Sequence, residues 1–443
     1  MKDRLFKEID NAPLIIFRIF LGFLLACETF GAILTGWVKA NFITPKFTFS
    51  HIGMEWLQPI PGNGMYYYFI VMGILGLLVM AGYKYRLSIA LYTIMWSGVY
   101  FMQKTSYNNH YYLLMLVCLM MCFLPAHRYA SVDVRQDPSI KKLTMPAWCS
   151  WVMIAMVSIV YFYATLAKFY LDWLNGTFAR QLLSRSVTND SLREIMTQKW
   201  FYLFIAYSGI VFDLFIVPLM LFKRTRTIAF IASLIFHIFN SITLQIGIFP
   251  FFALSFAVFF FPPERIRSIF FKKKPAVTNH NSATTREGIF ILRYFFIPYL
   301  IIQLVLPLRH YFIKGDVLFT EEGHRLSWRM MLRSRNGNTH FKVIDKSTNN
   351  ELFYDAFSDL TPKQEAGMGT RPDMIWQMAQ YIKQKFKNQG TDVSVYANTK
   401  VAINEGPYNV LVDPTVDLAA VPWNYYSHCA WILLYDSKGN PVK

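Results

Sequence analysis

The first two thirds of the chain alternate long apolar runs with short polar segments. Nine runs of about 17 to 24 residues contain few charged side chains, and one helix needs about 20 apolar residues to cross a bilayer. We therefore predict a polytopic α-helical membrane domain over residues 1–307. Its spans are expected at 13–36, 64–83, 87–104, 109–125, 147–168, 200–222, 227–245, 246–262 and 289–307.

The pattern changes after residue 307. The stretch "HFKVIDKSTNNELFY" alternates apolar and polar residues on both sides of a polar turn, which predicts a pair of strands. "DMIWQMAQYIKQKFKNQG" has helical periodicity, an acidic start, a basic last turn and Gly390 as a stop. "VSVYANTKVAI", "NVLVDP" and "CAWILLYD" are predicted as further strands. Residues 308–443 are therefore expected to form a strand-rich α+β domain.

The positive charges predict how the chain is threaded. If the N-terminus is cytoplasmic, the inner segments hold eighteen Lys and Arg residues and the outer segments hold eight. Cytoplasmic loops are normally richer in Lys and Arg. An odd number of spans then places the C-terminal domain outside the cytoplasm.

Composition supports a membrane protein and excludes a nucleic-acid-binding one. The 443 residues are 54% hydrophobic and 17% aromatic, with a net charge of +17. Residues 1–307 carry 28 Lys and Arg against 13 Asp and Glu, whereas residues 308–443 carry 16 against 14. The excess positive charge belongs to the membrane half, so we interpret it as topology and contact with anionic lipid.

Several familiar chemistries are missing from the sequence. The five cysteines form neither a disulfide framework nor a metal-ligand pattern, so no metal is expected. There is no Walker A motif, HExxH or G-x-S-x-G. Helices broken by Gly or Pro in matched halves, as in a transporter with inverted repeats, are not evident either.

The predicted topology brings three polar positions to one depth near the outer leaflet. Lys168 ends the fifth span, His110 begins the fourth beside Asn109, and His237 and Asn240 lie in the outer part of the seventh. Burial in an apolar setting favours the neutral form of an amine, which can accept a proton from a weakly acidic hydroxyl. A lipid-soluble substrate such as a quinol fits such a cavity.

Each of these residues also has a structural interpretation. Lys168 could extend its ammonium to the headgroups, and a lone interfacial histidine is more often structural. Asp172, four residues after Lys168, would favour the ammonium if it points the same way. Three ionisable residues within spans, Arg18, Glu28 and Asp213, are interpreted as packed polar links between helices.

Six stretches, in their order along the chain, resemble the vitamin K-dependent γ-glutamyl carboxylase family, in a short, bacterial-type form with an HTTM domain. They are "KTSYNNHYYL", "HRYASVDV", "VYFYATLAKFYLDWLNG", "FHIFNSITLQIGIFPF", "SWRMMLRSR" and "VDPTVDL". The third is similar to the segment that holds the family's catalytic lysine. The resemblance covers nearly the whole chain.

The resemblance implies a reaction and assigns roles to residues. Lys168 would deprotonate a reduced naphthoquinone, whose oxygenation creates a base strong enough to remove the γ-hydrogen of glutamate before CO2 adds. The quinone would end as its epoxide. His110 and His237 would orient the reactants, and Arg335 and Arg333 would meet the glutamate carboxylate. The quinone- and substrate-binding set would be completed by Asn109, Asn240, Trp328, Met330 and Met331.

The implied co-substrates are reduced vitamin K or menaquinol, O2 and CO2. The implied partners are membrane lipid and a glutamate-containing protein or peptide, and the expected location is a bacterial inner membrane with the C-terminal domain extracytoplasmic. Two departures concern the glutamyl substrate: Gly323 stands where animal enzymes have a leucine linked to glutamate binding, and Arg333 replaces a histidine. The alternatives are quinol epoxidase or oxidase activity alone, or non-enzymatic quinone binding. A channel or carrier is a further possibility, although the polar cluster lies at the outer side only.

Overall fold

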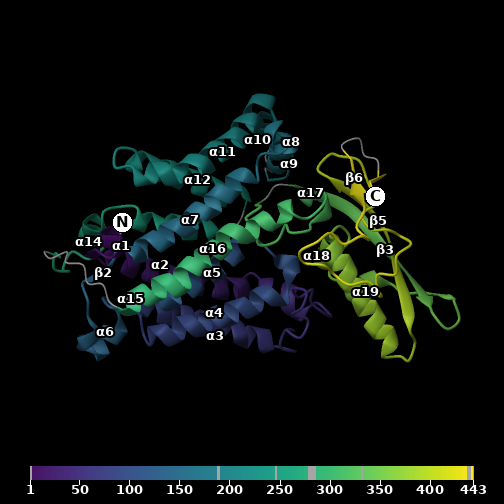
Figure 1. Cartoon of the computed structure of the whole chain (residues 1–443), viewed down its shortest axis with the longest axis horizontal. Helices are drawn as coiled ribbons and strands as arrows, with labels where there is room; N and C mark the ends of the chain where they lie inside the picture. Colours follow the sequence, from purple (N-terminus) through teal and green to yellow (C-terminus); the bar gives the residue numbers. More distant parts are fainter. Residues whose placement is uncertain are drawn as a thin grey trace.

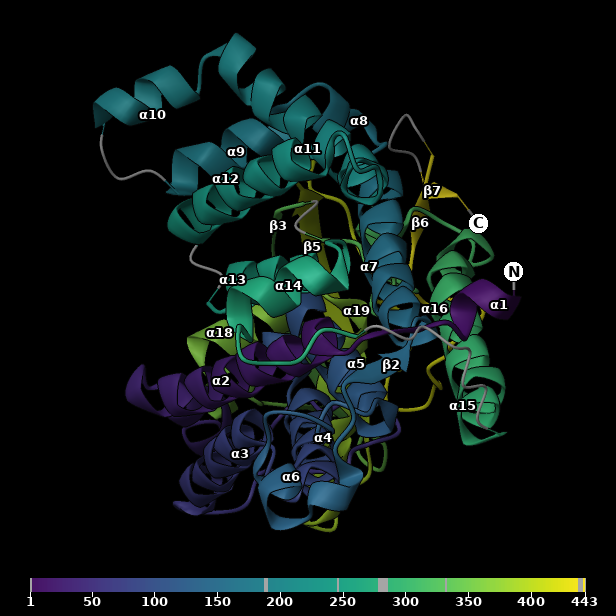
Figure 2. The same cartoon turned by 90° about the vertical axis from the view of Figure 1, so that its left-hand side faces the viewer.

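The computed structural model contains a helical body and a smaller, strand-containing C-terminal domain. The two lie at opposite ends of the long axis of the molecule (Figure 1). The structure describes residues 2–186, 190–244, 247–277, 286–330, 333–436 and 441–442. The view turned by 90° shows α3 and α4 on one side of the helical body and α11 and α12 on the other (Figure 2).

The helical body is built from long helices and a set of shorter ones. The long helices are α2 (Ala12–Leu34), α3 (Gly64–Ala81), α4 (Tyr85–Met102), α5 (Asn109–Phe123), α7 (Trp148–Leu166), α11 (Lys199–Leu221), α12 (Arg226–Leu244) and a continuous helix over Arg286–Tyr311 that includes α15 (Arg286–Ile291) and α16 (Ile297–Val305). The shorter ones are α1 (Lys2–Leu5), α6 (Val132–Gln136), α8 (Leu171–Leu174), α9 (Thr177–Ser186), α10 (Asp190–Met196), α13 (Phe249–Ser255) and α14 (Pro263–Phe270).

All nine apolar segments predicted as spans are largely helical, but they differ in length and apolar character. In the part of the chain that the structure describes, five helices are long and apolar enough to cross a membrane: Ala12–Leu34, Gly64–Ala81, Trp148–Leu166, Lys199–Leu221 and Arg286–Tyr311. Phe249–Phe259 and Pro263–Phe270 make a sixth if they count as one span despite a bend of 119°. The protein is thus a multi-span helical membrane protein. The number nine and the threading stay predictions.

Helices α2 and α3 pack with their backbones so close together that there is no room for side chains at two glycines. A Cβ atom on Gly22 would lie 2.3 Å from the backbone nitrogen of Met80, and one on Gly76 would lie 2.8 Å from the backbone nitrogen of Ala26. Small residues four apart permit such close packing between membrane helices.

Arg18 is a packed polar link between helices, as predicted. Its side chain is fully buried and donates to the backbone carbonyls of Ala126, at 3.0 Å, and Ala130, at 2.6 Å. Those carbonyls follow α5, so the guanidinium ties the N-terminal half of α2 to the chain after α5. The hydrogen bonds offset the cost of burying its charge.

The N-terminal segment is held in place by a small two-stranded sheet. Strands β1 (Glu8–Asp10) and β2 (Thr144–Pro146) pair antiparallel. Lys274 is fully buried and forms an ion pair with Asp10, and its Nζ donates to the carbonyl oxygen of Leu143 at 2.9 Å.

The C-terminal domain contains one three-stranded antiparallel sheet, in the order β4-β3-β5. Its strands are β3 (Arg335–Asp345), β4 (Glu351–Leu352) and β5 (Val393–Ile403), and its helices are α17 (Val317–Thr320), α18 (Pro362–Met368) and α19 (Pro372–Lys387). The alternating buried residues of β5 share one core with the buried face of α19. The predicted strand pair, helix and following strand are therefore confirmed.

Two other predicted strands form only in part. "NVLVDP" makes isolated bridges at Asn409 and Val412, and the last stretch contributes β6 (Leu434–Tyr435), which pairs with β7 (Pro441–Val442). The hydroxyl oxygen of Thr399 accepts from the backbone N–H groups of Leu411 and Val412, at 2.9 and 3.0 Å. A side chain thus takes backbone donors that a continuous ladder would use.

The segment between α2 and α3 joins the two parts of the molecule. Phe49, from this segment, belongs to the core of the C-terminal domain, and Phe47 stacks on Tyr381 of α19 with ring centroids 4.1 Å apart. The domain predicted from residue 308 onward therefore takes part of its core from the helical half.

A buried ion-pair group reinforces this junction. Asp373, in the first turn of α19, pairs with Lys104 at 2.7 Å and with Arg325 at 3.0 Å. Burial raises the pKa of Asp373, but the two cations outweigh it and hold that pKa well below its usual range. The carboxylate therefore remains charged at neutral pH.

Candidate active site

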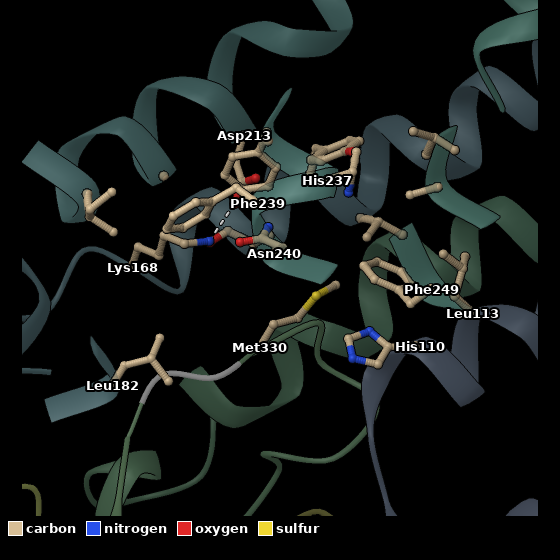
Figure 3. A pocket seen from close by; sticks show the side chains of 18 of the residues that line it. His110, Leu113, Lys168, Leu182, Asp213, His237, Phe239, Asn240, Phe249 and Met330 are labelled. Carbon is tan, nitrogen blue, oxygen red and sulfur yellow. Dashed lines mark hydrogen bonds and ion pairs between the residues drawn. The ribbon is translucent and has the colours of Figure 1, made fainter. Parts of the chain in front are cut away.

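The predicted polar cluster lines one cavity at the end of the helical body nearest the C-terminal domain. The cavity contains about 1210 Å³ of empty space and is bounded by α5, α7, α11, α12, α13 and the segment that carries Met330 (Figure 3). Its ionisable or amide side chains are His110, Tyr161, Lys168, Asp213, His237 and Asn240, and most other lining residues are apolar. A mostly apolar pocket with a few converging polar groups is typical of a small-molecule site.

Lys168 lies just beyond the end of α7 and points into the protein. The residue is only 8% exposed, and its Nζ donates to the carbonyl oxygen of Ala164 at 3.1 Å. The ammonium also lies 5.3 Å from the ring centroid of Trp173. The alternative in which Lys168 extends to the headgroups is therefore wrong.

The charged partner of Lys168 is Asp213 of α11, which the sequence analysis assigned to a structural link. The two side chains form a buried ion pair, drawn as a dashed line in Figure 3. Gly209, one turn earlier on α11, lies beside the same lysine, and a Cβ there would make an ordinary van der Waals contact of 3.8 Å with Cε of Lys168. An acidic residue inside a span is a functional candidate by default, and this was the signal that could have identified it.

Asp172 does not oppose the base in the way considered from sequence. Its carboxylate accepts a hydrogen bond of 2.6 Å from the side-chain amide of Asn404, in the C-terminal domain. It does not line the cavity in the described part of the chain. Proximity along the chain therefore gave the wrong acidic neighbour for Lys168.

Each histidine presents an unpaired ring nitrogen. His237 Nε2 lies 3.1 Å from the hydroxyl of Tyr161, while the ring of His110 packs 4.1 Å, centroid to centroid, from that of Phe249. Nδ1 of both histidines is buried without a hydrogen-bond partner among the described residues. Buried polar groups are normally satisfied, so these atoms are available to a ligand.

The other predicted site residues divide between the cavity and its support. Asn240 and Met330 line the cavity. Asn109 does not; its amide donates to the carbonyl oxygen of Arg329 at 3.0 Å and so holds the Met330 segment against α5. Trp328 is fully buried, 4.8 Å from the ring of Tyr112. Met331 lies outside the described residues.

Arg335 and Arg333 lie in the C-terminal domain, away from the cavity lining. Arg335 donates to the backbone carbonyls of Thr370, Leu318 and Phe319 at 2.6 to 3.0 Å, and Arg333 forms an ion pair with Glu321. Burial, followed by the charge of Arg371, lowers the pKa of Arg335 to about 9. The carboxylate contact predicted for these two residues stays a prediction, and it requires existing bonds to be exchanged.

A second cavity lies behind His110 and Phe249, which line both spaces. Glu28 of α2 and Tyr111 of α5 both line it. The role of Glu28 as a packed polar link between helices stays a prediction.

Comparison with known families now identifies the architecture. Residues 6–264 match the HTTM domain, which includes Lys168, His110, Asp213 and His237. Residues 290–438 match the lumenal domain of vitamin K-dependent gamma-carboxylase. The chain belongs to the vitamin K-dependent gamma-carboxylase family. No solved structure matches it.

Membership of the gamma-carboxylase family assigns sides to the two parts of the chain. The C-terminal domain corresponds to the family's lumenal domain, beyond a membrane domain of apolar helices. The family is named for dependence on vitamin K, and the cavity lies entirely within described residues of the two matched regions.

Proposed function

We propose that this protein is a membrane quinol-dependent γ-glutamyl carboxylase that also forms the quinone epoxide. The observation that carries the proposal is the amine of Lys168, buried in a largely apolar cavity together with two histidines that have free ring nitrogens. Menaquinol, with a bacterial inner membrane as the setting, is the proposed physiological co-substrate, because the sequence resembles the short, bacterial-type members of the family.

The cavity has the lining that a naphthoquinol head requires. Small-molecule pockets are mostly apolar with a small number of placed polar groups, and this cavity has that composition. Phe249 and Phe239 offer flat apolar contacts, and Asn240 lines the same space. A fused aromatic ring with two hydroxyl groups would be held by these rings and oriented by its polar groups.

Lys168 would act as the base toward one quinol hydroxyl. A positioned base must reach the proton that it removes, either directly or through one water. The unpaired Nδ1 atoms of His110 and His237 could orient the quinol oxygens. Oxygenation of the deprotonated quinol would supply a base strong enough for the γ-hydrogen of glutamate, which no neutral-pH side chain can remove.

The glutamyl substrate would approach from the lumenal side, where Met330 closes part of the cavity (Figure 3). Asn109 holds that segment in place. Arg335 and Arg333 remain the proposed contacts for the carboxylate. Their present contacts are within the C-terminal domain, so peptide use and quinol oxidation are expected to depend on different parts of the molecule.

Replacing Arg335 with alanine is expected to reduce carboxylation of a glutamyl peptide at least tenfold more than quinol epoxidation measured without peptide. The change removes a carboxylate partner and disturbs backbone carbonyls of the C-terminal domain, but leaves the cavity intact. The two rates, measured on the same preparation, test this. Equal losses would show that Arg335 supports the whole molecule.

The proposal is tested by incubating purified protein with vitamin K hydroquinone and O2 and measuring epoxide by mass spectrometry. Epoxide that is absent from the Lys168→Ala variant is the expected result. Wild-type protein that binds the quinol without forming epoxide would favour non-enzymatic quinone binding.

A second function, quinol epoxidation or oxidation without carboxylation, is favoured by one observation. The donors of Arg335 already contact backbone carbonyls. If no other group receives the glutamate, epoxide will form without CO2 fixation.

A further inference from the structure

Lys168 and Asp213 raise a question that the proposed base chemistry leaves open. An amine accepts a proton only when it is neutral, yet a carboxylate in contact with it favours the ammonium. Both side chains are buried. The proposed base therefore has to work in direct contact with a carboxylate.

The carboxylate of Asp213 has no second cation nearby in the described part of the chain. The Nζ of Lys168 makes its ion pair and hydrogen bond. Lys168 also donates to the carbonyl of Ala164, at the end of α7. Two fixed acceptors from different helices therefore define the position of Nζ.

The other titratable groups around the pair come from three helices. Tyr161 is on α7, seven positions before Lys168, and its hydroxyl is hydrogen-bonded to His237 of α12. His110 of α5 lines the same cavity. None of these is an acidic side chain, and Asp172 is turned to Asn404. Asp213 is the acidic side chain among the residues that line this cavity.

We propose that Asp213 is the positioning residue of the active site: it holds the Lys168 amine toward the cavity and sets the pH range in which that amine accepts the quinol proton. This rests on the proposed function. In the step, the quinol O–H bond breaks, an N–H bond forms on neutral Lys168, and the resulting ammonium is stabilised by the Asp213 carboxylate. Only a proton moves, so no oxidant is needed.

The same carboxylate has two opposing effects. It makes the neutral amine a stronger base, because the ammonium product is stabilised, and it makes that neutral amine rarer at a given pH. Removing the charge reverses both effects. A neutral residue at position 213 should lower the maximal rate and move the acid limb of the pH profile to lower pH.

Asp213→Asn tests this, because the amide keeps the size and an acceptor oxygen but loses the charge. The acid limb of the kcat/KM profile for epoxidation is expected to move down by about one to three pH units, the usual effect of one opposite charge. Asp213→Glu, which retains the charge, should keep the limb near its wild-type position. Asp172→Asn is the matched control and should leave it unchanged.

Lys168 itself gives a readout that does not need turnover. The pH dependence of its reaction with an amine-specific label, followed by mass spectrometry, should shift to lower pH in Asp213→Asn and stay in place in Asp172→Asn. If Asp213→Asn lowers the rate but shifts neither the acid limb of the pH profile nor the labelling curve of Lys168, the proposal is overturned. A purely structural role of Asp213 would give that result. Failure of both Asp213→Asn and the smaller Asp213→Ser to fold would overturn it too.

This outcome is separable from failure of the proposed function. If Lys168→Ala retains epoxidation, the assignment of the base is wrong, whatever Asp213 does. If Lys168→Ala is inactive and Asp213→Asn shows no shift, only the role of Asp213 is wrong.

Discussion

Lys168→Ala is expected to abolish quinol epoxidation, with a loss of about 10²- to 10⁴-fold, the usual contribution of a positioned general base. The change removes the amine from the cavity and none of its other lining side chains. Epoxide formation by purified wild-type and variant protein, at saturating hydroquinone, measures the effect.

A small primary amine should restore part of this activity, because it can occupy the vacated space beside Asp213. Lys168→Ala leaves that carboxylate buried without its cation, which is costly, so Lys168→Ala/Asp213→Asn serves as a control for folding. Lys168→Arg should stay inactive, because a guanidinium remains protonated. Near-normal turnover by the arginine variant would show that Lys168 supplies only charge.

Gly22→Ala is expected to cause a large loss of stability, because its Cβ would lie 2.3 Å from the backbone nitrogen and 2.6 Å from the Cα of Met80. Overpacking costs about 1–3 kcal/mol, and here the upper end is expected since two helix backbones must separate. Thermal unfolding in one detergent, at one scan rate, measures the change.

Gly31→Ala is the matched control on the same helix. A Cβ there meets nothing within 4 Å, and alanine is the better helix former by about 1 kcal/mol. The control should therefore unfold at or above the wild-type temperature. Equal behaviour of the two variants would mean that α2 and α3 do not pack at this distance.

Sequence patterns predicted the parts of this protein that depend on local order. Apolar runs located the helices, because an apolar run of about 20 residues has the length of a membrane-spanning helix. Alternation located β3 and β5, and the polar positions Lys168, His110 and His237 do line one cavity. These predictions needed only the depth of each residue along its own segment.

Contacts across helices could not be predicted in the same way. The partner of Lys168 is 45 positions away on another helix, whereas Asp172 was the nearer acid in sequence. Arg335 is long enough to reach either a substrate or the backbone, and only the placement of Thr370 and Leu318 shows which donors are occupied. Phe49 likewise joins a core that lies far along the chain.

The central claim is most directly tested by carbon fixation. Purified protein is supplied with vitamin K hydroquinone, O2, a glutamyl peptide and 14C-labelled bicarbonate, and both peptide label and epoxide are counted. We expect both products from the wild-type protein and neither from Lys168→Ala. Wild-type protein that yields neither product, while it remains folded and binds the hydroquinone, would contradict the assignment of a quinol-dependent carboxylase.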